Sequence, residues 1–341
     1  DIFECDDEKV YLLAKEIVNH NLHPDIDYED ALSYNMMGLH DNIKLFGEKE
    51  ALSLLKRYGR KSYLPVNSFT EYLRKNSFDL IITTNSPRFE LALQKAAYTL
   101  SIKSLSITDL FLTDEYEYIC NKDYAKYLTV FSEKTKNFIL EKGFKGQIEV
   151  TGNPAFDSLF EKDYSFDVMN FRNLMNLDNK DLLILWACPP LNVDKNCLDF
   201  KLILKCLEDF TKDNPSYKFI IRQHPNSKIF EKEFKLDNGI FCPKEISLEV
   251  CVNACDIVLS YNSTVLVHGA ILEKVLITHS HIETVFDNRF GLRYYNFSKK
   301  EYFSQVIKSA VNQKRNELGI DINSSSSEKV KLFIDKLLKE E

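Results

Sequence analysis

Short apolar runs alternate with longer amphipathic segments along most of this chain, and this alternation constrains the fold more than any other feature. In the apolar runs hydrophobic residues are nearly continuous, as in strands that are buried on both faces. In the longer segments they recur every three or four positions, as on one face of a helix. Strands that alternate with helices form parallel sheets covered by helices on both faces, so we expect an α/β protein.

The alternation occurs in two blocks, separated by a break near residues 152–166. The pattern predicts strands at 79–84, 104–108, 127–131 and 147–150 in the first block, and at 182–187, 218–222, 240–242, 256–260 and 275–278 in the second. It predicts helices at 10–19, 31–46, 48–58, 88–100, 133–142, 199–212, 247–254, 263–272, 300–312 and 327–338. Two such blocks predict two Rossmann-like domains.

The expected domain bounds follow from this division, because 341 residues exceed what one core usually serves. We expect an N-terminal domain at 1–152 and a C-terminal domain at 153–320. The remaining segment, 321–341, is expected to form a helix that packs back on the N-terminal domain. The chain begins at Asp1 rather than Met, so we expect the N-terminal domain to be trimmed at its start.

Composition excludes several classes of protein. The net charge is −7 with both signs interspersed, which argues against nucleic-acid binding because phosphate contacts need a basic face. The eight Cys residues form no CxxC pair, and several lie in apolar segments, as expected for reduced, buried thiols of a cytosolic protein. No apolar stretch approaches the ~20 residues that span a bilayer, and no secretory signal is visible.

Polar and titratable residues follow the predicted strands in both blocks. In open α/β sheets the ligand lies beyond the carboxyl ends of the strands, so these segments are the candidate site. The segments that follow the strands are 84–88 (TNSPR), 108–109 (TD), 188–190 (CPP), 222–226 (RQHPN), 260–264 (SYNST) and 279–281 (HSH).

Residues 256–277 (DIVLSYNSTVLVHGAILEKVLI) form the most informative of these units. An apolar strand runs into Ser260-Tyr261-Asn262-Ser263-Thr264, and a helix and a second strand follow. The first N–H groups of a helix have no internal partner and attract phosphate or another anion. Ser, Thr and Asn also cap helices that bind nothing, so on this segment alone a phosphate site and a plain N-cap are both open.

Four segments in a fixed order carry a family resemblance. They are FDLIITTNSPRFELALQKAAYTLSIKSLSI (78–107), VTGNPAFDSL (150–159), FIIRQHPN (219–226) and CDIVLSYNSTVLVHGAILEK (255–274). Together they resemble the GT-B superfamily, in particular UDP-N-acetylglucosamine 2-epimerase-like proteins and bacterial capsule and nonulosonate glycosyltransferases, over about residues 78–315. The resemblance implies two Rossmann-like domains with parallel sheets facing across a cleft, and a nucleotide sugar bound mostly on the C-terminal domain.

Departures from the epimerase pattern favour glycosyl transfer. Epimerases of this family carry Asp-Ser-Gly-Gly with paired Glu where this chain has residues 260–264, and Glu-Ala-Gly-Leu-Arg where it has 108–112. Most carboxylates that would move the proton at sugar carbon 2 are therefore absent. His268 stands where such glycosyltransferases often carry the Glu that holds the ribose, which leaves UDP- and CMP-linked donors both open.

The resemblance and the strand ends together suggest roles for residues of the C-terminal domain. We expect Ser260, Asn262, Ser263 and Thr264 to contact phosphate through hydroxyl, amide and backbone N–H groups, with His268 in the nucleotide site. We expect His224 to donate to the leaving phosphate, as a cation or as a general acid, although a hydrogen-bonded structural His fits the sequence too. Arg222 is expected either to face the same site or to pair with a surface acid.

In the N-terminal domain, Asp109 is the candidate base, because inverting transfer needs a group to take the proton from the acceptor hydroxyl. An N-cap role for Asp109 is the alternative, and Asp114 and Glu115 are the next candidates. Asn85, Ser86 and Arg88 would bind an anionic acceptor or a donor carboxylate at a helix start, or form ordinary surface structure.

We therefore expect a metal-independent GT-B glycosyltransferase of bacterial surface-polysaccharide or glycoprotein assembly. A UDP-N-acetylhexosamine 2-epimerase-like isomerase and a non-catalytic GT-B docking subunit are the alternatives. The nucleotide sugar would be a substrate, with no cofactor, and the acceptor a glycan or glycoprotein. His279 and His281 offer too few ligands for a metal. The expected location is the cytoplasm, and the resemblance is also compatible with association with the inner face of the membrane.

Overall fold

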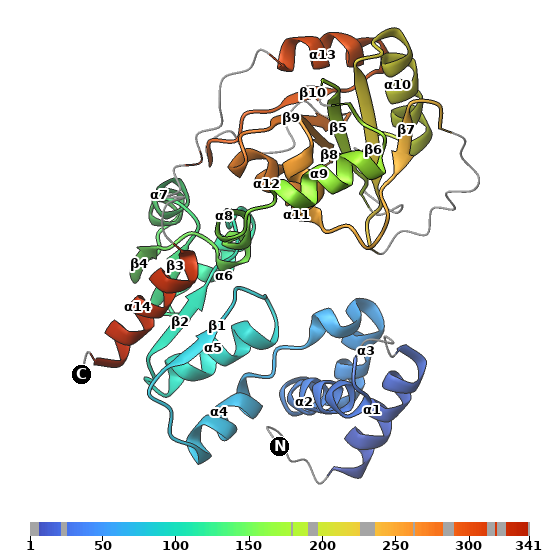
Figure 1. Cartoon of the computed structure of the whole chain (residues 1–341). Coiled ribbons are helices and arrows are strands. Elements are labelled where there is room, and N and C mark those ends of the chain that lie inside the picture. The colour runs from blue at the N-terminus through green and yellow to red at the C-terminus, as the bar shows by residue number, and fades with distance from the viewer. Residues whose placement is uncertain are drawn as a thin grey trace. The chain divides into compact units, whose positions relative to one another are not determined.

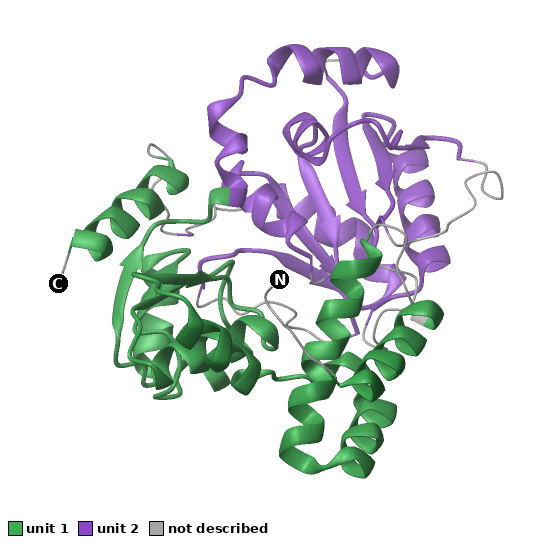
Figure 2. Ribbon diagram, turned by 90° about the horizontal axis from the view of Figure 1, so that it is seen from below, with its two compact units in different colours: residues 1–154, 323–341 green, residues 155–322 purple. Residues whose placement is uncertain are grey.

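The computed structural model describes residues 7–21, 26–178, 180–189, 197–225, 236–261, 263–281, 290–311, 318 and 325–339. Two all-parallel sheets with flanking helices confirm the expected α/β class (Figure 1). The chain divides into two compact units (Figure 2). Unit 1 consists of residues 1–154 and 323–341, and unit 2 of residues 155–322.

Unit 1 opens with helices that pack on one another. They are α1 (Glu8–Asn21), α2 (Tyr28–Phe46), α3 (Glu48–Tyr58) and α4 (Val66–Lys75). The carboxylate of Asp27 starts α2 by accepting from the backbone N–H groups of Glu29 and Asp30, and Gly47, with φ 75°, ends it. The buried side chains between these helices include Val10, Ala14, Val18, Leu39 and Tyr63.

The sheet of unit 1 has the order β1-β2-β3-β4, all parallel. Its strands are β1 (Ile81–Thr83), β2 (Ser104–Ile107), β3 (Tyr127–Val130) and β4 (Gln147–Val150). Its connecting helices are α5 (Phe89–Thr99), α6 (Tyr116–Ile119) and α7 (Glu133–Glu141). Because consecutive strands are neighbours and parallel, the carboxyl ends of all four lie along one edge.

The last helix, α14 (Ser326–Lys339), packs on the sheet of unit 1 (Figure 1). The ring of Phe333 meets the ring of Tyr127 edge-to-face at 6.3 Å between centroids. These two side chains form a buried cluster with Leu105 and Leu337. The Lys103 ammonium also donates to the carbonyl oxygen of Leu337 at 3.1 Å. The final residues therefore complete the cover of a sheet formed some 200 residues earlier in the chain.

Unit 2 holds a larger sheet, in the order β10-β9-β8-β5-β6-β7 and again all parallel. Its strands are β5 (Leu182–Ala187), β6 (Tyr217–Arg222), β7 (Gly239–Phe241), β8 (Ile257–Ser260), β9 (Val275–His279) and β10 (Tyr295–Phe297). Its helices include α8 (Ser158–Glu161), α9 (Ser165–Leu174), α10 (Phe200–Asp213), α11 (Leu248–Ala254), α12 (Val265–Ile271) and α13 (Phe303–Ala310).

Buried residues cover the central strands of this sheet on both faces. The central strand β5 is buried from Leu183 to Ala187, and Trp186 stacks on Phe200 of α10 with 4.8 Å between ring centroids. The main cluster also contains Phe219, Leu259 and Ile277, from three neighbouring strands. Burial on both faces explains why these strands read as continuous apolar runs rather than alternating ones.

The structure adds elements to the expected set and shifts others. The helices α4 and α9 and the edge strand β10 were not predicted. The expected helix at 300–312 begins as a 3-10 turn, Lys300–Tyr302, and becomes α-helical only from Phe303 to Ala310. The expected helix at 263–272 is the shorter α12.

The packing of α14 predicts unequal effects for two neighbouring residues. Phe333 is 4% exposed and Leu332 is 68% exposed. Phe333→Ala should lower the free energy of unfolding by about 3 kcal/mol, because it leaves a cavity against Tyr127 and Leu105. Leu332→Ala is the matched control and should change it by less than about 0.5 kcal/mol. Urea unfolding followed by circular dichroism measures both, and similar losses in the two variants would contradict the packing.

Candidate functional site

The carboxyl ends of the central strands of unit 2 place one row of residues across the sheet. Ala187 of β5 is in register with Arg222 of β6 on one side and with Ser260 of β8 on the other. Ser260 is in turn in register with Thr278 of β9. Three of the four side chains in this row are polar, namely one guanidinium and two hydroxyl groups. They lie at the edge where parallel α/β sheets bind their ligands.

The segment after β8 supplies further hydroxyl groups. Ser260 is fully buried, and its hydroxyl donates to the Ala187 carbonyl oxygen at 2.7 Å. The Ser263 hydroxyl accepts from the backbone N–H of Val265, the first residue of α12, at 3.3 Å. Thr264 is exposed, and its side chain makes no cap hydrogen bond. Asn262, predicted to contact phosphate, lies outside the described residues.

Arg222 is half-buried and points to groups of the segment around α11. Its Nη1 atom donates to the carbonyl oxygen of Ile246 at 2.6 Å and lies 3.5 Å from the sulfur of Cys251 and 3.8 Å from that of Cys242. A hydrogen bond with Cys242, together with burial, raises the pKa of the Cys251 thiol, so that thiol stays neutral. No carboxylate of the described residues is within ion-pair distance of Arg222, so the expected surface acid is not among them.

Two histidines flank this row. His224 follows β6 and is half-buried, two residues beyond Arg222. His268 lies on α12, where its Nδ1 atom is 3.0 Å from the carbonyl oxygen of Thr264 and its ring meets Phe156 edge-to-face at 4.8 Å. These contacts hold the His268 ring in place within unit 2.

At the carboxyl edge of unit 1, Asp109 and Asn85 belong to one hydrogen-bonded group. The buried Asn85 side chain donates to the Asp109 carboxylate at 3.1 Å, and the backbone N–H of Leu110 donates to the same oxygen at 2.8 Å. Asn153 donates to the Asp109 carbonyl oxygen at 2.7 Å. Asp109 is exposed, and the next helix starts only at Tyr116, so Asp109 is not a helix N-cap.

Glu90 is a member of this edge that the sequence analysis missed. From the first turn of α5, its carboxylate accepts from the backbone N–H of Ser86 at 2.9 Å and from the Thr84 hydroxyl. Arg88 was expected in the first turn, but it is the N-cap residue with φ −123° and ψ −96°. The sequence signal for Glu90 was an acidic residue in the first turn of the expected helix, where the helix dipole favours negative charge.

Two further features surround Asp109. The Tyr118 hydroxyl donates to the Asn85 carbonyl oxygen, and burial raises the pKa of Tyr118 well above its usual range. Leu112, three residues after Asp109, has φ 59°, a left-handed conformation that costs a Leu side chain energy. Strained residues of this kind persist where the surrounding structure fixes them, and they cluster at functional sites.

His279 has a structural environment rather than that of a ligand. It ends β9, fully buried, with its ring near those of Trp186, Tyr261 and Phe297. Burial lowers the pKa of His279 to about 3. His281, its expected neighbour, is exposed.

Two searches of the described residues give negative results. They contain no group of three or more His, Cys, Asp or Glu side chains placed to hold a metal ion. None of their helices has the length and apolar character to cross a membrane.

Comparison with known proteins identifies the fold. No protein-family model and no curated protein matches the chain. Among solved structures, UDP-GlcNAc 2-epimerase from Neisseria meningitidis bound to UDP-GlcNAc is similar with a TM-score of 0.59 and 15% identity, over 79% of this chain and 80% of that one. The enzyme from Methanocaldococcus jannaschii, in complex with UDP-GlcNAc and UDP, gives 0.57 and 18%, over 80% and 81%.

A third similar structure covers more of the chain. The S. aureus MnaA–UDP co-structure has a TM-score of 0.58 and 14% identity, over 89% of this chain and 93% of that one. At such identities the likeness shows the fold alone, and this fold is the one that the resemblance in the sequence led us to expect.

The burial of His279 predicts a specific pH dependence of stability. Its pKa is about 3 in the folded protein against 6.5 for an ordinary His, so below pH 6.5 the unfolded chain binds the extra proton. The free energy of unfolding should therefore fall with pH, by about 2 kcal/mol between pH 6.5 and roughly 4.5, with no contribution above that range. His279→Leu should remove this component, and urea titrations at each pH measure it.

The exposed neighbour provides the control for that experiment. His281→Gln removes an exposed His and should keep the full pH dependence of the parent protein. A His279→Leu protein whose stability declines with falling pH as steeply as that of His281→Gln would contradict the burial of a neutral imidazole.

Proposed function

We propose that unit 2 binds a nucleotide-activated sugar at the carboxyl edge of its sheet. The observation that carries this proposal is the in-register row of Arg222, Ala187, Ser260 and Thr278, in which the guanidinium has no acidic partner among the described residues. The positively charged guanidinium at this edge can donate hydrogen bonds to a phosphate group. The similar structures support the choice of ligand, because three of them contain UDP-GlcNAc or UDP.

Within this site, different residues would contact different parts of the ligand. Arg222 and the hydroxyl-rich segment with Ser263 and Thr264 would hold the phosphates, and His224 would donate to the leaving phosphate. His268, fixed by Thr264 and Phe156, would contact the nucleoside. Donors already in place when negative charge develops stabilise the transition state without reorganisation.

Removal of the two hydroxyl groups after β8 tests this site. The double variant Ser263→Ala and Thr264→Ala should weaken nucleotide binding at least tenfold, because it removes two phosphate donors. Isothermal titration with UDP, CDP, CMP, GDP and dTDP measures the dissociation constants. Ser216→Ala, an exposed hydroxyl at the amino end of β6, is the matched control and should bind like the parent. Equal affinities in the double variant and the parent would place the nucleotide elsewhere.

We propose glycosyl transfer as the reaction. The described residues that directly follow β5, β6, β8 and β9 include hydroxyl groups and imidazoles but no Asp or Glu. Such an edge can stabilise a leaving phosphate, and its described residues offer no carboxylate for removing a proton from carbon. In unit 1 Asp109 would take the proton from the acceptor hydroxyl, with Asn85 and Leu110 N–H orienting it. Asn85, Ser86 and Arg88 would contact the acceptor or a donor carboxylate.

The acceptor and setting follow from the resemblance. We propose a bacterial surface glycan or glycoprotein as acceptor, modified in the cytoplasm or at the inner face of the membrane. No cofactor or metal is required in this scheme, because the leaving phosphate is stabilised by side chains.

Epimerisation at sugar carbon 2 is the second candidate, and the similar structures favour it by their own activity. The two candidates differ in their products. Without any acceptor, an epimerase converts the UDP-sugar either to its UDP-linked 2-epimer or to the free 2-epimer and UDP. A transferase releases the nucleotide rapidly only with an acceptor. Proton exchange at carbon 2 in deuterated water without acceptor would therefore support the epimerase.

The role of Asp109 generates a prediction for kinetics. Asp109→Asn keeps the side-chain shape and removes the base, so kcat should fall by about a hundredfold while the donor dissociation constant stays unchanged. Asp79→Asn, an exposed carboxylate at the amino end of β1, is the control and should keep full activity. Acceptor-dependent nucleotide release from the donor measures kcat. Full activity of Asp109→Asn would remove this residue from the mechanism.

A further inference from the structure

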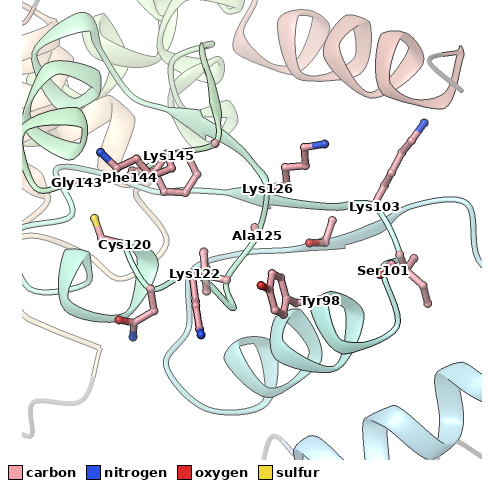
Figure 3. A pocket seen from close by; sticks show the side chains of 15 residues that line it. Tyr98, Ser101, Lys103, Cys120, Lys122, Ala125, Lys126, Gly143, Phe144 and Lys145 are labelled. Carbon is pink, nitrogen blue, oxygen red and sulfur yellow. The ribbon is translucent and has the colours of Figure 1, made fainter.

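A cavity of about 860 Å³ lies in unit 1, at the opposite edge of the sheet from Asp109 (Figure 3). Three turns form it, each leading into the amino end of a strand. They are the turn between α5 and β2, the segment before β3 and the turn between α7 and β4. Its volume lies in the range of roughly 300–1,000 Å³ that is typical of small-molecule sites.

The lining of this cavity is cationic. Lys103, Lys122, Lys126 and Lys145 line it, and no Asp or Glu does, in a chain whose net charge is −7. We call this cavity, with its four lysines, the lysine pocket. Lys122 and Lys145 make no hydrogen bond, ion pair or ring contact with the described residues. No described residue therefore pairs with either charge.

Helix ends do not explain these lysines. Cations in the last turn of a helix are stabilised by its dipole, but this effect fades within about one turn. Lys142 holds such a position, as the C-cap of α7, and it is not part of the lining. Lys145 lies three residues further on, and Lys122 follows α6, a helix of only four residues. The concentration of positive charge therefore goes beyond what the helices need.

The walls of the pocket are fixed by backbone contacts. Ser101 and Gly143 adopt left-handed conformations, with φ 57° and 100°, in two of the turns. A Cβ atom on Gly146 would lie only 2.1 Å from the Lys126 carbonyl oxygen, so this turn packs directly on the neighbouring backbone. Gln147 N–H donates to the same oxygen at 3.0 Å. The pocket is thus formed in advance, and a ligand would not have to order it.

The remaining lining suits a polar organic ligand. Tyr98 is 49% exposed and presents its ring, and Ser101 and Asn121 add a hydroxyl and an amide. Lys103 and Lys126 border the pocket from neighbouring strand starts. The Lys103 ammonium donates to the Leu337 carbonyl oxygen, and the Lys126 ammonium lies over the Tyr127 ring. In Figure 3 the Lys103 and Lys126 side chains extend toward α14, whereas the Lys122 side chain extends in the opposite direction.

We propose that the lysine pocket binds a soluble polyanion that carries several separated phosphate or carboxylate groups. The lining supplies four lysines and no carboxylate, the volume of the cavity suits a small organic ligand, and rigid walls lower the cost of binding. This inference is independent of the nucleotide site of unit 2, since no residue is shared. It gives the protein a second binding site, for an acidic substrate segment or an acidic effector.

Titration of the full-length chain tests the proposal, with inorganic tripolyphosphate as the phosphate probe and trigalacturonate as the carboxylate probe. Maltotriose is the neutral reference. One or both anions should bind at low salt, and the stronger of the two identifies the source of the negative charge. Maltotriose should not bind. Affinity should fall several-fold when the salt concentration rises from about 50 to 300 mM.

A pair of double variants separates the pocket from general electrostatics. Lys122→Gln with Lys145→Gln should raise the dissociation constant at least tenfold. Lys49→Gln with Lys56→Gln removes the same charge from the exposed face of α3 and should leave it within twofold. The Ser263→Ala and Thr264→Ala variant should also bind the anion normally, which distinguishes this site from the nucleotide site.

Three outcomes would overturn the proposal. Equal weakening in both lysine double variants would show a non-specific charge effect. Absence of binding to either anion at low salt would show that the pocket has no such ligand. Binding only to phosphatidylglycerol vesicles, with neither soluble anion bound, would assign the lysines to a membrane surface instead.

Discussion

The alignment of the carboxyl ends of β6, β5, β8 and β9 is the constraint on which the proposed nucleotide site depends. Ala187 sits between Arg222 and Ser260 in the central strand, and the Ser260 hydroxyl bonds to the Ala187 carbonyl oxygen at 2.7 Å. Side chains alternate along a strand, so a slip of one residue would turn the row to the other face. The hydrogen bond between Ser260 and Ala187 and the packing of Trp186 on Phe200 hold this register and, with it, the site.

The two units differ in the charge at the carboxyl edge of their sheets. In unit 1 the carboxylates of Asp109 and Glu90 lie at the strand ends, and Glu90 already satisfies the Ser86 N–H at the start of α5. In unit 2 a guanidinium and hydroxyl groups lie there, and the Ser263 hydroxyl accepts from the backbone N–H of Val265 at the start of α12. A phosphate-bearing ligand therefore finds repulsion at one edge and, at the other, a guanidinium with no carboxylate partner among the described residues. This contrast supports donor binding on unit 2 and proton transfer on unit 1.

Periodicity predicted most of the fold because buried parallel strands leave a strong signal. Strand β4 and strand β5 begin and end at the predicted residues, and β6 differs by one. Strand β10, only Tyr295–Phe297, is too short for any period to show. Helix α9 was missed because Phe166, Met169 and Leu174 are apolar yet exposed, which blurs its buried face.

The site was less predictable, because its geometry depends on distant partners. Strand ends pointed to Arg222 and Asp109, but not to the contacts that orient them. Arg222 is held by Ile246 and two thiols from a segment twenty or more residues later. Asn85 meets Asp109 only because β1 and β2 are neighbours, and Asn153 reaches the same residue from beyond β4.

The sheet of unit 1 also shows how one architecture creates two opposite edges. Parallel strands of four residues separate the edges by about 13 Å. Helices start near the carboxyl edge and end near the amino edge. Because the helix dipole is positive at its start and negative at its end, the carboxyl edge favours anions and the amino edge favours cations. Glu90 satisfies the first preference. The amino edge carries more lysines than the helix dipoles favour, since Lys122 and Lys145 lie beyond the helix ends. Fixed positive charge beside a preformed cavity is stabilised most directly by an external anion.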